Sequence, residues 1–178
     1  LSRKIIVYHK GKNMTINDVK ENKIAPFEIE DTKLRRLFSF FLHTAPTIDS
    51  NLASKIDEDR LLNNWNNFVS NYANNKILVY SYSYELIQQF EKYGLSDESK
   101  VSHKLNAIVC KKKKQAETNY QCVLRHLRNS LAHCNLYIAN AGNRKYILFE
   151  DYNKKGNITA RMLLSQDFLN KLRKELMK

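Results

Sequence analysis

The chain has 178 residues, of which 43% are hydrophobic, and it carries 30 lysines and arginines against 18 aspartates and glutamates. This length and apolar content suffice for one domain with a core of ordinary size, and they argue against a disordered chain. The net charge of +12 favours a polyanionic partner, nucleic acid first and an anionic membrane surface second, although a basic charge can also serve solubility alone.

Several classes of protein are disfavoured at once. No run of about 18 apolar residues is present and the first residues lack a long apolar stretch, so we expect neither a transmembrane helix nor a signal peptide. Only 4 glycines and 2 prolines are present, too few for the tight turns of an all-β fold. The three cysteines, Cys110, Cys122 and Cys134, are an odd set without a CxxC pair, which favours a cytoplasmic location without disulfides.

The first 30 residues are expected to be irregular, with a possible strand at "KIIVYHK" and a short helix capped by Thr15 and Asp18. From residue 31 the apolar residues recur at helical spacing. This pattern predicts helices from about residue 31 to Pro46 and through residues 61–72. We interpret residues 76–94 as a helix as well, although their first half alternates like a strand. Residues 101–109 are predicted to form another helix, which ends in four lysines.

After residue 135 the apolar residues no longer recur at helical spacing but at every second position, as in a strand. The stretch 136–164 is predicted to form strands joined by the turns "NAGN" and "NKKGN", and Ser165 caps a last helix over 165–178. The sequence therefore predicts a single, mainly α domain over residues 1–178. Its helical bundle occupies residues 31–135, and a small antiparallel sheet or hairpin lies near the C-terminus.

The helix predicted in "YQCVLRHLRNSLAHCNLY", residues 120–137, has two distinct sides. Its core-facing stripe consists of Tyr120, Leu124, Leu127 and Leu131. The roughly opposite, polar side gathers Cys122, Arg125, His126, Asn129 and His133. Arg128 lies on the flank between them and is five residues before His133, so the two side chains point about 140° apart on a regular helix. They can meet if the helix loosens near His133, or if two copies pack about a two-fold axis.

Arg128 and His133 together suit the cleavage of RNA. A neutral imidazole at His133 can take a proton from a ribose 2′-hydroxyl, whose oxygen then attacks the adjacent phosphate. The Arg128 guanidinium would stabilise the charge that develops on the phosphoryl oxygens, and Asn129 could orient the imidazole or hydrogen-bond the phosphate. This chemistry needs no metal and leaves a 2′,3′-cyclic phosphate. A purely structural role for these residues stays open at this stage.

Further polar residues are candidates for binding RNA. Arg125 and His126 could contact phosphate, as could the run Lys111, Lys112, Lys113 and Lys114, although such a run is more often a solvated helix end. A zinc site built from Cys122, His126, His133 and Cys134 is disfavoured, because residues 122 and 133 lie far apart along a straight helix. We therefore expect no metal and no other cofactor.

The stretch "LRNSLAH", with Arg128 and His133 separated by four residues and Asn129 directly after the arginine, resembles the Rx4-6H signature of the HEPN superfamily (higher eukaryotes and prokaryotes nucleotide-binding). The resemblance implies a helical bundle, a homodimer with a composite ribonuclease site, and a role as a toxin or in abortive infection and antiviral defence. It also implies an RNA substrate and a possible antitoxin or activator. The alternative it allows is a non-catalytic module for RNA binding or dimerisation.

Overall fold

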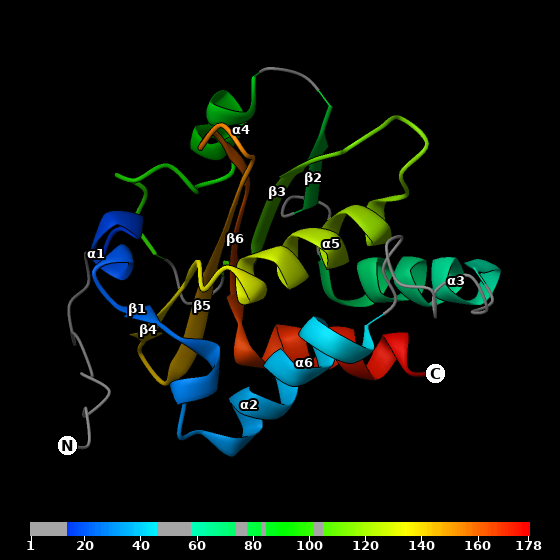
Figure 1. The fold of residues 1–178 in the computed structure, drawn as a ribbon, viewed down its shortest axis with the longest axis horizontal. Coiled ribbons are helices and arrows are strands. Elements are labelled where there is room, and N and C mark those ends of the chain that lie inside the picture. The colour runs from blue at the N-terminus through cyan, green and yellow to red at the C-terminus, as the bar shows by residue number, and fades with distance from the viewer. Residues whose placement is uncertain (1–13, 46–57, 74–77, 83–84, 102–104) are drawn as a thin grey trace.

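A computed structural model describes residues 14–45, 58–73, 78–82, 85–101 and 105–178 (Figure 1). The α-helices are α1 (Ile16–Lys20), α2 (Thr32–Ser39), α3 (Glu58–Phe68), α4 (Leu86–Lys92), α5 (Asn119–Ala132) and α6 (Gln166–Leu176). The strands are β1 (Lys23–Ile24), β2 (Leu78–Ser81), β3 (Ala107–Lys111), β4 (Leu136–Ala141), β5 (Arg144–Tyr152) and β6 (Ile158–Ser165). A 3-10 turn η1 (Pro26–Glu28) precedes α2, and α2 and α3 continue as the π-helical turns η2 (Phe40–Thr44) and η4 (Val69–Ala73).

The six strands form one mixed sheet in the order β1-β4-β5-β6-β3-β2. Neighbours pair antiparallel, except that β2 runs parallel to β3 at the far edge. The long hairpin of β5 and β6 lies at the centre, where Phe149 pairs with Met162 and Leu148 with Leu163. The two edge strands, β1 and β2, thus come from the first half of the chain, and the four inner strands come from the second half.

Helices cover both faces of the sheet, as Figure 1 shows. One face packs against α2, α3, α5 and α6, and its residues on the central strand are Ile147 and Phe149. The opposite face packs against α1 and α4, and there the central strand contributes Tyr146 and Leu148. Because both faces are buried, the strands are continuously apolar rather than alternating.

The predicted fold class, a mainly α bundle with a small sheet near the C-terminus, is wrong. Residues 107–111 form strand β3 rather than the end of a helix, and residues 78–81 form strand β2 ahead of the short helix α4. Even the segment before residue 31 supplies the edge strand β1 and helix α1. The physical reason is the burial of both faces, since a short apolar run such as "AIVC" carries no alternation to distinguish a strand from a buried helix.

Other elements agree with the sequence. Thr15 and Asp18 form a reciprocal capping box at the start of α1, and the Ser165 hydroxyl accepts a hydrogen bond from the Phe168 N–H at the start of α6. The strands predicted within 136–164 are β4, β5 and β6. The strand suggested at "KIIVYHK" and the helix end at Pro46 lie outside the described residues. No helix in the described ranges combines the length and the apolar character needed to cross a bilayer.

Candidate functional site

Helix α5 carries the motif residues and lies against the sheet. It begins with a capping box, in which the Thr118 hydroxyl accepts from the Gln121 N–H and the Gln121 side chain accepts from the Thr118 N–H. Its predicted core stripe, Tyr120, Leu124, Leu127 and Leu131, is buried among the helices that cover this face. The sequence therefore identified the apolar side of this helix correctly.

The polar side of α5 faces the sheet rather than solvent along most of its length. Cys122 is 0% exposed and His126 is 1% exposed. Arg125 and Asn129 are half-buried, and each donates a hydrogen bond to a carboxylate. The polar residues gathered there thus form the interface between helix and sheet, and only the end of the helix at His133 is open to solvent.

His126 bridges two strands. Its Nδ1 lies 2.7 Å from a carboxylate oxygen of Asp151 on β5, and its Nε2 lies 2.8 Å from the backbone carbonyl of Lys111 on β3. Burial alone disfavours the imidazolium, but the Asp151 hydrogen bond and the contact with Cys122 outweigh it and raise the pKa of His126 to about 9. The ring is therefore protonated at neutral pH and donates from both nitrogens.

Arg125 is held by a buried carboxylate. Its Nε donates to Oε1 of Glu117 at 2.6 Å and its Nη2 donates to Oε2 at 2.9 Å, a forked pair whose carboxylate is 0% exposed. Burial of Glu117 opposes its ionisation, but the Arg125 hydrogen bond lowers the pKa of Glu117 overall. Nη2 also donates to the Lys111 carbonyl at 3.1 Å. This guanidinium thus fastens the middle of α5 to the end of β3 and to the segment that follows that strand.

Asn129 and Arg128 are both half-buried. The Asn129 amide donates to Oδ2 of Asp151 at 3.1 Å, the same oxygen that accepts from His126. Burial opposes ionisation of Asp151. The hydrogen bond from His126 is the largest of the effects that outweigh burial and lower the pKa of Asp151 below its usual range. Asn129 therefore joins the polar network beneath α5.

His133 is exposed at the end of α5. The helix stays regular up to it, because the His133 N–H still bonds the Asn129 carbonyl at 2.9 Å. The chain then turns sharply at Cys134, whose φ of 56° is left-handed. The Cys134 N–H bonds the Leu131 carbonyl and the Asn135 N–H bonds the Ser130 carbonyl, which is the Schellman pattern. This ending presents the His133 ring to solvent just before β4.

The lysine run lies at the other end of α5. Lys111 ends strand β3, Lys112 is half-buried, and Lys113 and Lys114 are exposed in the turn that leads to the helix. The predicted helix end at these lysines is therefore wrong, because the preceding residues form a strand. Helix α5 has 14 residues, which at about 1.5 Å per residue places the run roughly 20 Å from His133.

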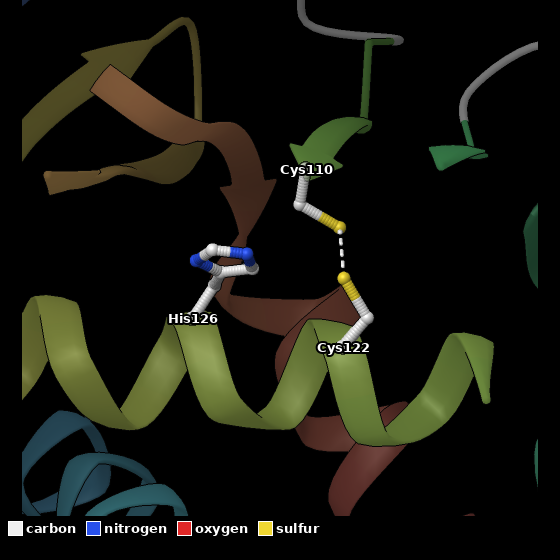
Figure 2. Close-up of side chains that lie close together, drawn as sticks. All are labelled: Cys110, Cys122 and His126. Atoms are coloured by element: carbon white, nitrogen blue, oxygen red, sulfur yellow. Dashed lines mark hydrogen bonds between the residues drawn. The ribbon is translucent and has the colours of Figure 1, made fainter. Parts of the chain in front are cut away.

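Cys110 and Cys122 meet under α5. Their Sγ atoms lie 3.3 Å apart, and Figure 2 shows both thiols on the side of the helix from which His126 also projects. The three side chains offer ligand atoms within 4.8 Å of one another. The Cys110 thiol, against the opposing effect of burial, lowers the pKa of Cys122 to about 6. The sequence missed Cys110 as a neighbour of this helix, because it lies on a strand that had been predicted as helical.

A basic hollow of about 670 Å³ lies apart from the motif, between α2, α6 and the β4–β5 turn. Its cationic lining residues are Lys33, Arg36, Arg144, Lys145 and Arg173. Two acids also line it, and each has a lysine partner: Asp31 pairs with Lys145 at 2.6 Å and Asp167 with Lys171 at 2.8 Å. The hollow is thus a second place, besides the lysine run, where positive charge gathers.

The two acids that organise the site were not predicted from the sequence. Glu117 and Asp151 are both buried, and both accept from residues of α5. Asp151 could have been found, because it shares the parity of Ile147 and Phe149 on β5 and so points to the same face. An acid at that position of a strand with two buried faces requires a partner.

Comparison with protein-family models gives a match to the family described as HEPN pEK499 p136, over residues 8–178. The match covers nearly the whole chain, so this is a HEPN protein, in agreement with the resemblance carried by "LRNSLAH". It belongs to the HEPN pEK499 p136 family, and HEPN proteins include ribonucleases. No curated protein and no solved structure matched the chain in the other two comparisons.

Proposed function

We propose that the protein is a metal-independent endoribonuclease of HEPN type that acts as a homodimer, in phage defence or as a toxin. The observation that carries the proposal is the position of His133 at the exposed end of a motif helix whose residues Arg125, His126 and Asn129 are engaged inside the fold. A histidine whose exposed side chain is not buried by any described residue, five residues after an arginine in a HEPN chain, is available for chemistry on a ligand.

The regular end of α5 favours a site shared between two copies. Because the helix does not loosen before His133, Arg128 and His133 of one chain point about 140° apart. Two helices related by a two-fold axis would bring the histidine of each copy towards the arginine of the other. This arrangement supports a homodimer whose ribonuclease site is composite.

In this cleft His133 is the general base that removes the proton of a ribose 2′-hydroxyl, and Arg128 stabilises the negative charge on the phosphoryl oxygens. The 2′-oxygen attacks the phosphorus, the 5′-oxygen leaves and takes a proton, and a 2′,3′-cyclic phosphate results. Asn129 is an orienting group, because its hydrogen bond to Asp151 holds the last turns of α5 against the sheet. Neither step requires an ion at the reacting phosphate.

Electrostatics would bring RNA to the cleft. The chain carries a net charge of +12, and the exposed Lys113 and Lys114 precede the N-terminus of α5, where backbone N–H groups also favour anions. Lys111 and Lys112 extend this positive stretch. Arg125 and His126 act behind the surface by positioning this segment, because both donate to the Lys111 carbonyl.

The test is cleavage of a mixed pool of tRNA and structured RNA in EDTA by the wild-type chain, by Arg128→Ala and by His133→Ala. We expect cyclic-phosphate ends from the wild type, and a loss of about 10²- to 10⁴-fold in rate when the general base is removed. Arg128→Ala should also lose cleavage while RNA affinity stays within a few-fold. Equal cleavage by all three proteins would remove both residues from the mechanism.

A second reading, a non-catalytic module for RNA binding or dimerisation, is favoured by one observation. Arg125, His126 and Asn129 all serve the fold, so the polar side of α5 has fewer groups for substrate than the motif helix implied. This module would bind RNA with a steep dependence on salt and form no product, both as the isolated chain and with an activator.

A further inference from the structure

The dithiol beneath α5 has the composition of a metal site. Cys110 on β3 and Cys122 on α5 are both 0% exposed, and His126 follows Cys122 by one helical turn. Figure 2 shows the two thiols and the imidazole converging from two elements on one small space. Their ligand atoms all lie within 4.8 Å of one another, and in the described ranges no fourth His, Cys, Asp or Glu side chain joins them.

The surroundings of His126 match those of a metal-binding histidine. Such a histidine usually donates its second ring N–H to a carboxylate, which fixes the orientation of the ring and makes it a better ligand. Here Nδ1 bonds Asp151 at 2.7 Å, and Asn129 holds the same carboxylate oxygen at 3.1 Å. This leaves Nε2 as the nitrogen that can bind an ion, once its proton has left and its bond to the Lys111 carbonyl is released.

The thiols have suitable support too. The Arg125 guanidinium lies 3.9 Å from Cys122 Sγ and can donate to a metal-bound thiolate, while Glu117 balances its charge. Two thiolates neutralise a divalent ion, so the occupied site would bury no net charge of its own. The S–S distance of 3.3 Å is shorter than the separation of two ligands bonded at about 2.3 Å in a tetrahedral site. Binding thus requires the thiols to move apart slightly.

We propose that Cys110, Cys122 and His126 form a structural site for one thiophilic metal ion, Zn²⁺. Thiolate and imidazole are the ligands that zinc prefers, and the Lys111 carbonyl, 2.8 Å from Nε2, could take the fourth position once that hydrogen bond is released. The ion would join strand β3 to helix α5 at residues that precede Arg128 and His133 on the helix. The inference does not depend on cleavage.

The experiment titrates the full-length chain, chelator-treated and kept reduced by a phosphine, with Zn²⁺ and with Co²⁺ as a spectroscopic probe. We expect one equivalent of zinc to bind, the melting temperature to rise, and Co²⁺ to give a thiolate charge-transfer absorption band. Cys110→Ser should lose all three effects, whereas Cys134→Ser should keep them, because Cys134 lies outside the cluster. Asp151→Asn should bind zinc about 10- to 100-fold more weakly.

Several outcomes would overturn the site. Absence of the Co²⁺ band in the wild-type chain does so without any variant, so the test survives even if Cys110→Ser fails to fold. Equal zinc binding by Cys110→Ser would assign the ion to other residues. Recovery of the purified chain without metal and with a Cys110–Cys122 disulfide, followed by failure of the reduced chain to bind zinc, would assign the pair to redox chemistry instead.

Discussion

The middle and the C-terminal end of helix α5 use similar residues in opposite ways. Around Arg125 and His126 the polar side chains face the sheet, and buried carboxylates hold them. At His133 the helix has passed beyond this network and the side chain is exposed. The polar side of a motif helix is therefore not one functional surface, because the same stripe begins as an interior network and ends at solvent.

The difference arises from what lies opposite each part of the helix. The middle of α5 lies near the end of β3 and the segment after it, where Glu117 and the Lys111 carbonyl supply acceptors. The end of α5 is followed at once by a tight turn, and nothing in the described ranges buries the His133 side chain. Burial and pairing, rather than residue type, separate the residues that support the fold from the residue available for chemistry.

The buried network around Arg125 should show the largest loss of unfolding free energy on substitution. Glu117→Ala removes the carboxylate that accepts from Arg125 and from the Lys113 N–H, and leaves the guanidinium without its counter-charge. Breaking a buried pair in this way costs about 3 to 5 kcal/mol of unfolding free energy, measurable by urea denaturation. Glu98→Ala, at an exposed position, is the control and should stay within about 0.5 kcal/mol. Equal effects for the two variants would show that the buried network does not support the fold.

Asn129 lies between the buried middle of α5 and its exposed end, so its substitution tests where the buried network stops. Asn129→Ala loses the 3.1 Å bond to Asp151 and should lower the unfolding free energy by about 1 kcal/mol. If its part in cleavage is only to position the end of the helix, kcat should fall while RNA affinity holds. Unchanged stability together with lost cleavage would instead mean that Asn129 contacts the substrate.

Replacing Cys134 with glycine should raise the unfolding free energy instead of lowering it. Its φ of 56° is a conformation that costs a residue with a side chain about 1 to 2 kcal/mol, and glycine is the usual residue at this position of a Schellman ending. Cys134→Gly should raise the unfolding free energy by about 0.5 to 1 kcal/mol, since the greater backbone entropy of unfolded glycine offsets part of the relief. Cys134→Ala keeps the strained backbone and is the control. A stabilisation as large for alanine would assign the effect to the side chain.

How far the sequence predicts the fold depends on how each element is buried. Helices with one apolar stripe, such as the core side of α5 with Leu124 and Leu127, are correctly predicted, and so are the strands after residue 135. Strand β3 was missed, because Ile108 and Val109 are buried on opposite faces of the sheet and leave no period of two. Strand β2 does alternate, but the helical spacing of the residues after it led to a helix being predicted over the whole of residues 76–94.

The candidate site divides in the same way. The motif helix and the family are readable from "LRNSLAH" and its context, and the roles of Arg128, Asn129 and His133 stay predictions. Two contacts were not readable. Asp151 is 25 residues from His126 in the chain, and Cys110 is on a misassigned strand, so their meeting with α5 depends on tertiary structure alone.

His133 should have the smallest effect on stability and the largest effect on function. His133→Ala removes an exposed side chain without a buried partner in the described residues, so the unfolding free energy should change by less than about 0.5 kcal/mol. Cleavage, if the proposed chemistry holds, should fall by about 10²- to 10⁴-fold. Urea denaturation and cleavage assays on the same preparation therefore distinguish the structural role of the middle of α5 from the proposed catalytic role of its C-terminal end. A large loss of stability in this variant would place His133 in the buried network and remove the contrast on which the assignment of the general base rests.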